Sequence, residues 1–237
     1  MSRGSEIISR TLDLGLDNGM TVMIVDHTNA FGEVRLLEIY EKMKDLSPKE
    51  LRLFRFFCER DVIIRNSVTG KIVARRETGV GQGSNNGGNW FNLSQVEKLL
   101  GMQRRLREVE DECREDMDIM EEVRKGFTFA YFDDVFVLAE PFVASRFAPE
   151  VKPLIKEYGG NVNLSKCWLV GKNVHEYPGD YNDWKISEEG AKVLGHFTGT
   201  SDWKMEQLTL KVAKSAPPSR VLSLVRPFSG YVLISKC

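Results

Sequence analysis

The feature that most constrains the fold is a dense apolar segment, residues 127–139, whose only charged residues are Asp133 and Asp134. Aromatic and β-branched residues dominate on both sides of this pair, which is typical of buried strands. Two such strands with a polar pair between them predict a β-hairpin that carries two carboxylates at its tip. A hydrophilic turn explains the pair as well as a metal site does, so the surroundings must decide.

A third carboxylate follows another predicted strand. Residues 21–25 (TVMIV) form a short apolar, β-branched run, and Asp26 comes directly after it. Taken alone, Asp26 is an ordinary strand-end residue. If the two strands are neighbours in one sheet, the three carboxylates repel one another unless cations lie between them. Two hard divalent cations about 3.5–4 Å apart could then activate an attacking 3′-hydroxyl and stabilise a leaving pyrophosphate.

The remaining segments predict an α+β fold, with an antiparallel sheet packed on helices. Helices are expected over residues 33–43, from Ser47 onward with Pro48 in the first turn, over 90–125 with a candidate break at Gly101, over 143–158 with an interruption at Pro149 or Pro153, and after Asp202. A second hairpin is expected over 61–77, and short strands over 162–170 and 193–195.

Composition is ordinary for a soluble globular protein, with 237 residues, 42% of them hydrophobic and 28% charged. No stretch approaches the roughly 20 apolar residues that span a bilayer, and the N-terminus has no apolar signal core. We therefore expect no membrane partner and an intracellular location, nuclear or cytoplasmic. The four scattered cysteines argue against a zinc site or a disulfide framework.

Charge is unevenly distributed along the chain, although the net charge is only −1. Acidic residues concentrate between positions 108 and 122, and none follows Glu206, whereas five Lys or Arg residues do. A basic tail beside an acidic helix fits a surface that faces phosphates. It fits ordinary solvated charge equally well.

Five segments in one order resemble the motifs of reverse transcriptases. They are Val25-Asp26 with Ala30-Phe31 (motif A), Thr78-Gly79-Val80-Gly81-Gln82-Gly83 (motif B), Ala130-Tyr131-Phe132-Asp133-Asp134 (motif C), residues 159–167 (motif D), and residues 191–195 with Gly199-Thr200 (motif E). The pattern over residues 21–200 is similar to the palm domain of non-LTR retroelement enzymes. The resemblance implies a lead-in over 1–20, a palm over 21–200, and the start of a thumb or a C-terminal helix over 201–237.

The resemblance also implies an activity and its partners. The chain would be an RNA-directed DNA polymerase that uses Mg²⁺ or Mn²⁺, an RNA template, a DNA primer and deoxynucleoside triphosphates, together with the remaining domains of a retroelement. The implied roles are Asp26 and Asp133 as principal metal ligands with Asp134 in support, His27 as a backbone contact to a metal, Phe31 beneath the incoming sugar, Gln82 and Gly83 against template or nucleotide, and Lys166 near the triphosphate. Phe31 could instead be a core residue, and Lys166 an exposed strand-end lysine.

Two departures from the family pattern leave alternatives open. No proline follows Gln82-Gly83, and only 25 residues precede Asp26, so the fingers subdomain is expected to be missing. One alternative is a catalytically inactive or domesticated palm-like module that binds RNA or a protein. Another is a different palm enzyme, such as a nucleotidyl cyclase or an RNA-templated RNA polymerase.

Overall fold

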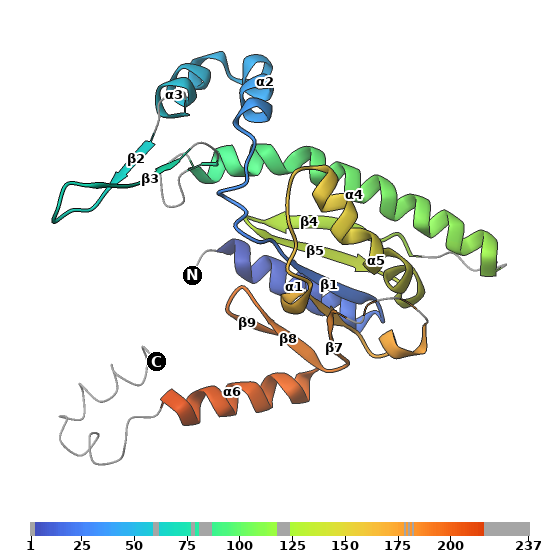
Figure 1. Cartoon of the computed structure of the whole chain (residues 1–237). Helices are drawn as coiled ribbons and strands as arrows, with labels where there is room; N and C mark the ends of the chain where they lie inside the picture. Colours follow the sequence, from blue (N-terminus) through green and yellow to red (C-terminus); the bar gives the residue numbers. More distant parts are fainter. Residues whose placement is uncertain are drawn as a thin grey trace, which may run out of the picture.

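The computed structural model describes residues 3–58, 62–76, 79–80, 87–117, 124–177, 179, 181 and 183–215. Figure 1 shows a central sheet with helices on both faces. The helices are α1 (Arg3–Asp17), α2 (Leu36–Leu46), α3 (Pro48–Cys58), α4 (Gly87–Met117), α5 (Pro141–Glu157) and α6 (Ser201–Ser215), with two 3₁₀ turns, η1 (Leu164–Lys166) and η2 (Val174–Glu176). The strands are β1 (Thr21–Asp26), β2 (Val62–Arg65), β3 (Ile72–Arg76), β4 (Phe127–Tyr131), β5 (Asp134–Ala139), β6 (Trp168–Val170), β7 (Lys185–Ser187), β8 (Gly190–Val193) and β9 (His196–Gly199). The fold is therefore α+β, as predicted.

The main sheet has five strands in the order β4-β5-β1-β6-β7. β1 lies in the middle and pairs antiparallel with both β5 and β6. The prediction of a wholly antiparallel sheet is wrong at one edge, because β6 and β7 are parallel. The chain crosses over through residues 171–184 before β7, and a three-residue strand is too short for its direction to be visible in the sequence.

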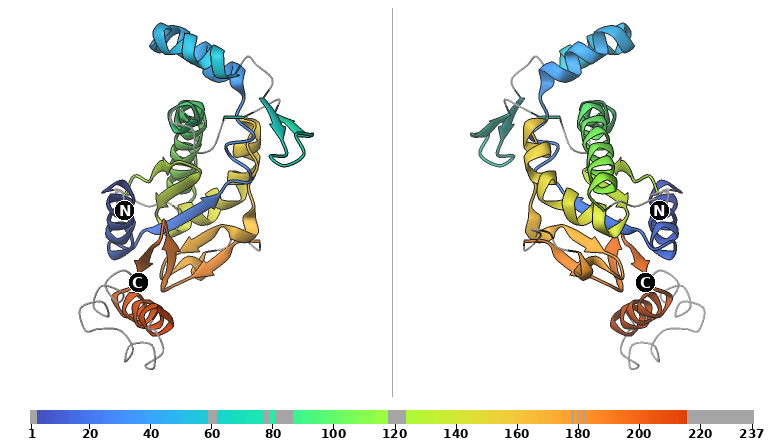
Figure 2. Two further views of the ribbon diagram at one scale, coloured as in Figure 1. Left: turned by 90° about the vertical axis from the view of Figure 1, so that its left-hand side faces the viewer. Right: turned by 90° about the vertical axis from the view of Figure 1, so that its right-hand side faces the viewer.

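Side chains of β1 alternate between two apolar layers, as the two-residue period of a strand requires. Met23 and Val25 face the layer formed with α4 and α5, whereas Val22 and Ile24 face the layer formed with α1 and β8. Figure 2 shows α1 on one side of the sheet and α4 and α5 on the other. Because β1 is buried on both faces, its position is fixed tightly, and the residue that ends it is held with it.

The helix predicted over residues 33–43 begins later, at Leu36. The preceding segment turns instead, since the backbone amides of Gly32 and Glu33 both donate to the carbonyl of Asn29. The next helix begins at Pro48, as the Ser47-Pro48 signal predicted. The turn at 29–35 places Phe31 against α4, where its ring stacks on that of Phe91.

The break expected at Gly101 does not occur, and α4 is continuous from Gly87 to Met117. A Cβ atom at position 101 would lie 2.2 Å from the hydroxyl oxygen of Tyr158. Gly101 therefore permits a close approach of the segment after α5 and does not end the helix. This contact packs α4 closely against the end of α5.

The interruption expected at Pro149 or Pro153 is also absent, because α5 runs through both residues. Each proline removes one backbone hydrogen bond from a helix. The helix buries one long apolar face against the sheet, and packing of such a face supplies most helical stability in proteins. Burial of this apolar face thus offsets the backbone hydrogen bonds that the two prolines remove.

Two short strand predictions need correction. Only Trp168–Val170 of the segment 162–170 is a strand, and Leu164–Lys166 is a 3₁₀ turn. Leu194 and Gly195 form the turn of the β8–β9 hairpin, with φ of 50° and 86°, and do not extend a strand. Two positive φ values in a two-residue loop match the tight turns that suit a twisted hairpin.

Three parts lie around the sheet. α1 covers one face, where Ser9 Oγ lies 3.0 Å from Thr198 Oγ1 of β9. Helix α6 is tied to α1 by the ion pair between Lys204 and Asp13, at 3.0 Å. Helices α2 and α3 and the predicted hairpin β2–β3 project from the opposite end (Figures 1 and 2). The proposed boundaries at residues 20 and 200 stay predictions.

Candidate metal and nucleotide site

Asp26 and Asp134 lie directly opposite each other in the sheet. They are the last register pair of the antiparallel β1–β5 ladder. Opposed residues in such a ladder have Cα atoms about 4.5–5.5 Å apart and side chains on the same face. By the alternation of β1 and β5, that face is the one shared with Ile24 and Phe136, on the α1 side. Asp133 is the next residue, on the turn between β4 and β5.

The charges of these three residues influence one another. The pKa of Asp134 is raised from 3.8 to about 6, first by burial and then by the negative charges of Asp133 and Asp26. The ionised form of Asp134 is therefore less favourable than that of an ordinary carboxyl, and nearby positive charge would favour it. Oxygen-only carboxylate ligands of this kind suit a hard divalent cation such as Mg²⁺. Among the described residues, no group of three or more His, Cys, Asp or Glu side chains is already arranged as a metal cage.

Lys166, the lysine predicted from the sequence to lie near the triphosphate, is close to Asp26. Its Nζ atom lies 4.0 Å from Oδ2 of Asp26, and its side chain is 63% exposed. An exposed pair at this distance contributes little to stability. The lysine is held by the 3₁₀ turn η1 beside the end of β1, from which its ammonium group can reach an anion near Asp26.

The backbone at the end of β1 is bonded on its β6 side. The carbonyl of Asp26 accepts a hydrogen bond from the amide of Asn163, at 3.1 Å. The amide of Asp26 donates to Sγ of Cys167, at 3.3 Å. Burial raises the pKa of the Cys167 thiol to about 11, so it stays protonated and donates in turn to the carbonyl of Asn163. The segment 159–167 is thus hydrogen-bonded to the end of β1.

The acidic turn is bonded to His27. The imidazole Nδ1 of His27 lies 2.8 Å from the backbone carbonyl oxygen of Asp133. Its Nε2 lies 3.3 Å from Nζ of Lys98, which also donates to Oε1 of Gln95 at 2.8 Å. Because an ammonium group can only donate, Nε2 of His27 accepts and Nδ1 carries the proton. His27 therefore donates to Asp133.

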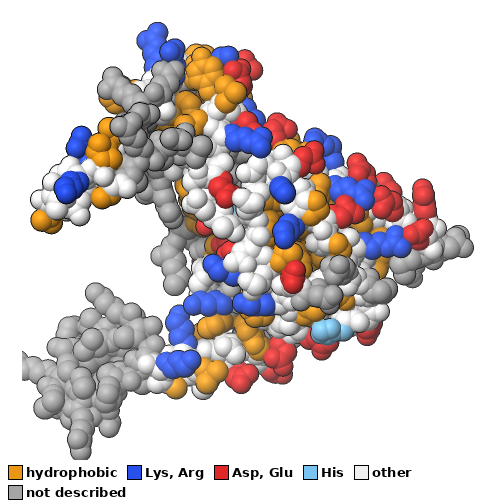
Figure 3. All heavy atoms as spheres, in the orientation of Figure 1, with side chains coloured by type: hydrophobic (Ala, Val, Ile, Leu, Met, Phe, Trp, Pro, Cys, Tyr) orange, Lys and Arg blue, Asp and Glu red, His pale blue; other side chains and the backbone are white. Residues whose placement is uncertain are grey.

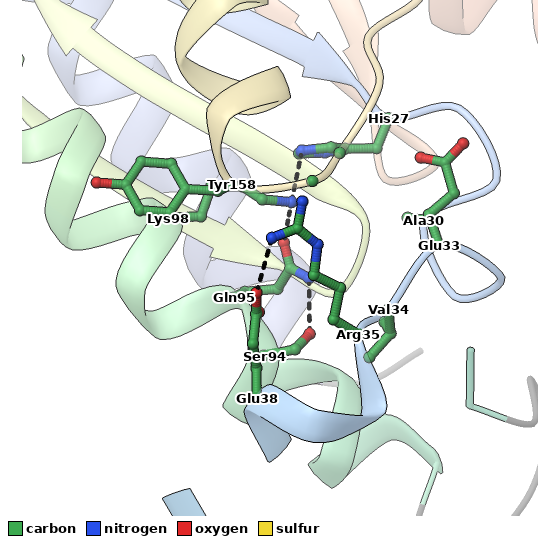
Figure 4. Close-up of a pocket in the computed structure, with 12 residues that line it drawn as sticks. His27, Ala30, Glu33, Val34, Arg35, Glu38, Ser94, Gln95, Lys98 and Tyr158 are labelled. Carbon is green, nitrogen blue, oxygen red and sulfur yellow. Dashed lines mark hydrogen bonds and ion pairs between the residues drawn. The ribbon is translucent and has the colours of Figure 1, made fainter. Parts of the chain in front are cut away.

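His27 and Lys98 are both buried, and Figure 4 shows them on the wall of a cavity of about 20 Å³. The pKa of His27 is lowered to about 4, chiefly by burial and then by the charge of Lys98. The pKa of Lys98 is lowered to about 8 by burial, although Glu33 and Glu38 oppose this. At neutral pH His27 is uncharged and Lys98 is a cation. Sequence reasoning missed Lys98, because a single lysine within a helix looks like surface charge.

Phe31 lies in the turn after β1 and packs against α4. Its ring stacks on that of Phe91, with centroids 4.2 Å apart and planes inclined by 16°. It is partly buried in the apolar cluster that joins α2, α3 and α4. The alternative role of Phe31, packing in the core, is therefore present, and the expected contact with a sugar stays a prediction.

Gln82 and Gly83 lie outside the described residues. The two residues described just before them are bonded to the turn that carries Phe31. The amide of Val80 donates to the carbonyl of Phe31 at 2.9 Å, and that of Gly79 to the carbonyl of Val34 at 3.1 Å. The segment that leads to Gln82 therefore starts beside the turn that follows Asp26.

Comparison with protein-family models gives no match, and comparison with curated proteins gives none either. Among the described residues, no helix has the length and apolar character needed to cross a bilayer. A functional assignment must therefore come from the motifs and from the geometry of this site.

Proposed function

We propose that this chain is the palm of a reverse transcriptase of the non-LTR retroelement type, and that it adds deoxynucleotides to a DNA primer on an RNA template. The observation that carries the proposal is the register pair of Asp26 and Asp134, with Asp133 beside it. Chance resemblance in sequence gives no reason for carboxylates from two distant segments to lie opposite each other in one sheet. Their convergence is what two-metal nucleotidyl transfer requires.

The residues of the site would have two roles, metal binding and neutralisation of the triphosphate. Asp26, Asp133 and Asp134 would hold Mg²⁺ or Mn²⁺. Burial raises the pKa of Asp134 most, and the repulsion by Asp133 and Asp26 that adds to it favours the binding of a cation. When bound, two such ions activate the primer hydroxyl and stabilise the leaving pyrophosphate. Lys166, 4.0 Å from Asp26, would bring a positive charge to the triphosphate.

The projection formed by α2, α3, β2 and β3 supports a nucleic-acid partner. Within residues 36–73, the described side chains carry seven Lys or Arg residues and four Asp or Glu residues. Figure 3 shows that the molecule is hollowed between this projection and α6, and in Figure 1 the β4–β5 turn points toward that side. A basic surface beside a hollow that leads to an acidic site suits a phosphate backbone whose end is to be extended.

Primer extension by the purified full chain tests the proposal. With an RNA template, a labelled DNA primer, dNTPs and Mg²⁺ or Mn²⁺, we expect extension by the wild type. Asp133→Asn should reduce it at least about a hundredfold, because it removes one ligand charge. Asp111→Asn is a matched control, since that side chain is 69% exposed on α4 and distant in sequence from the turn. Extension by wild type and Asp133→Asn at equal rates would refute the proposal.

A palm-like module that binds nucleic acid without catalysis is the second candidate. It is favoured by the absence, among the described side chains, of a ready-made cage of three metal ligands. Under this alternative, the chain binds an RNA–DNA duplex with equal affinity in EDTA and in Mg²⁺, and it extends no primer. Under the first, Mg²⁺ is required for extension.

A further inference from the structure

We infer that Lys98 is a positioning residue for the acidic turn, because its ammonium group holds the ring of His27 in the position from which Nδ1 donates a hydrogen bond to the carbonyl of Asp133. The inference rests on the proposed function, since it assigns the turn a role in catalysis. Neither residue would touch the substrate through this contact. Lys98 would act through His27, and His27 through the backbone of the turn.

The contacts form one chain from α4 to the turn. Lys98 Nζ lies 3.3 Å from His27 Nε2, and His27 Nδ1 lies 2.8 Å from the Asp133 carbonyl oxygen. His27 is itself held in line with the sheet, because it forms an isolated antiparallel bridge with Val162. A side chain fixed at its backbone and at both ring nitrogens has one orientation.

The turn is a place where such support has an effect. It has only two residues, Phe132 and Asp133, between β4 and β5. Phe132 has φ of 55°, a left-handed conformation that is unfavourable for a bulky residue and persists where neighbouring contacts impose it. A donor fixed on the carbonyl of Asp133 is one such contact, and it sets the direction of the carboxylate that follows Phe132.

The burial of Lys98 is costly, which argues that its charge has a purpose. The residue is 6% exposed, and its two hydrogen-bond partners among the described residues, His27 and Gln95, are uncharged. An aliphatic residue would pack there without loss of hydration. The space over the ammonium is also kept small, because a Cβ atom on Gly160 would lie 3.0 Å from Nζ.

A purely structural role, in which Lys98 only ties α4 to β1, predicts a different behaviour. Removal of Lys98 would then change the stability of the fold and would not change the rate of nucleotide addition. Two measurements separate these roles. The first does not depend on enzymatic activity, and the second does.

The first measurement is the ¹⁵N NMR spectrum of the imidazole nitrogens in the full chain, which contains only three histidines. We expect one histidine of the wild type to be the Nδ1–H tautomer, assigned to His27 by its loss in His27→Asn. In Lys98→Met the Asp133 carbonyl still requires Nδ1–H, and the ¹⁵N signal of the unprotonated Nε2 should shift because that nitrogen loses its hydrogen-bond donor. Arg104→Met, which removes an exposed charge from the same helix, should leave both signals unchanged. An Nε2–H tautomer in the wild type, or no change in Lys98→Met, overturns the inference.

The second measurement is primer extension by the same variants. Lys98→Met should lower kcat about tenfold and alter KM for the nucleotide less than twofold, and Arg104→Met should do neither. His27→Asn offers a permanent amide donor in place of Nδ1–H, so it should retain more activity than His27→Leu. In the His27→Asn background Lys98→Met should cause no further loss, and an additive loss there overturns the inference. If the wild type extends no primer, the proposed function fails, and the NMR measurement alone decides the role of Lys98.

Discussion

Asp26, the last residue of β1, lies opposite Asp134, the first residue of β5, in the closing pair of an antiparallel ladder. The two residues are separated by 108 positions in the chain, and each follows or precedes a strand buried on both faces. Rigid strands on both sides leave the carboxylates little freedom to separate. They share a small volume whose charge balance depends on pH and on cations.

The first prediction concerns stability and pH. The folded-state pKa of Asp134, about 6, is above its usual value of 3.8, so its ionisation opposes folding. The penalty is absent below about pH 3.8 and is complete above about pH 6. Asp134→Asn should therefore increase the free energy of unfolding at pH 7.5 by about 1–2 kcal/mol, allowing for screening of a partly exposed group. Urea unfolding without divalent cations measures this.

At pH 4.5 the gain from Asp134→Asn should fall to about a third of its value at pH 7.5, because this pH lies only a little above 3.8, where the penalty begins. Asp111→Asn, at an exposed position, controls for the general effect of removing one negative charge. A wild type as stable as Asp134→Asn at pH 7.5 would mean that the three carboxylates do not share one volume.

The second prediction concerns Lys166. Lys166→Ala should leave the free energy of unfolding within about 0.5 kcal/mol of the wild type, since its pair with Asp26 is exposed and 4.0 Å long. It should nevertheless reduce the rate of nucleotide addition at least about tenfold, because a positive charge near the triphosphate is lost. Lys172→Ala, another exposed lysine in the same part of the chain, is the control. Equal rates of nucleotide addition in the two variants would mean that Lys166 is an exposed surface charge with no role in the reaction.

The third prediction separates the two roles of Phe31. Phe31→Ala should destabilise the fold by about 1–3 kcal/mol, because the ring stacks on Phe91. If the ring also lies beneath the incoming sugar, the same variant should raise ribonucleotide use relative to deoxynucleotide use at least about tenfold. Phe91→Leu removes the stacking partner from the buried side and should cost stability without that change. A ratio that rises equally in both variants would assign Phe31 to packing alone.

Much of the fold could be predicted from local patterns. The hairpin around Asp133 was visible because both flanking runs are apolar and β-branched or aromatic, and Ser47-Pro48 marked the start of α3. Asp26 could be assigned to a strand end for the same reason. Asp26 lies beside Asp133 and Asp134 only because β1 and β5 are neighbours in the sheet. The sequence suggested this strand order only through the resemblance of its motifs.

Other features depend on contacts between distant segments and had no local signal. Gly101 looked like a helix break, although its purpose is the approach of Tyr158. Pro149 looked like an interruption, although burial keeps α5 intact. Lys98 could not be recognised, because its contact is with His27, 71 residues earlier in the chain.

The most direct test of the account is an anomalous diffraction map from crystals of the full chain soaked in MnCl₂. We predict a manganese peak about 2 Å from a carboxylate oxygen of Asp26 and from one of Asp133 or Asp134. The same soak of Asp26→Asn crystals should weaken or abolish that peak. Mn²⁺ bound elsewhere, with no peak at these carboxylates under conditions that support primer extension, would contradict the central claim.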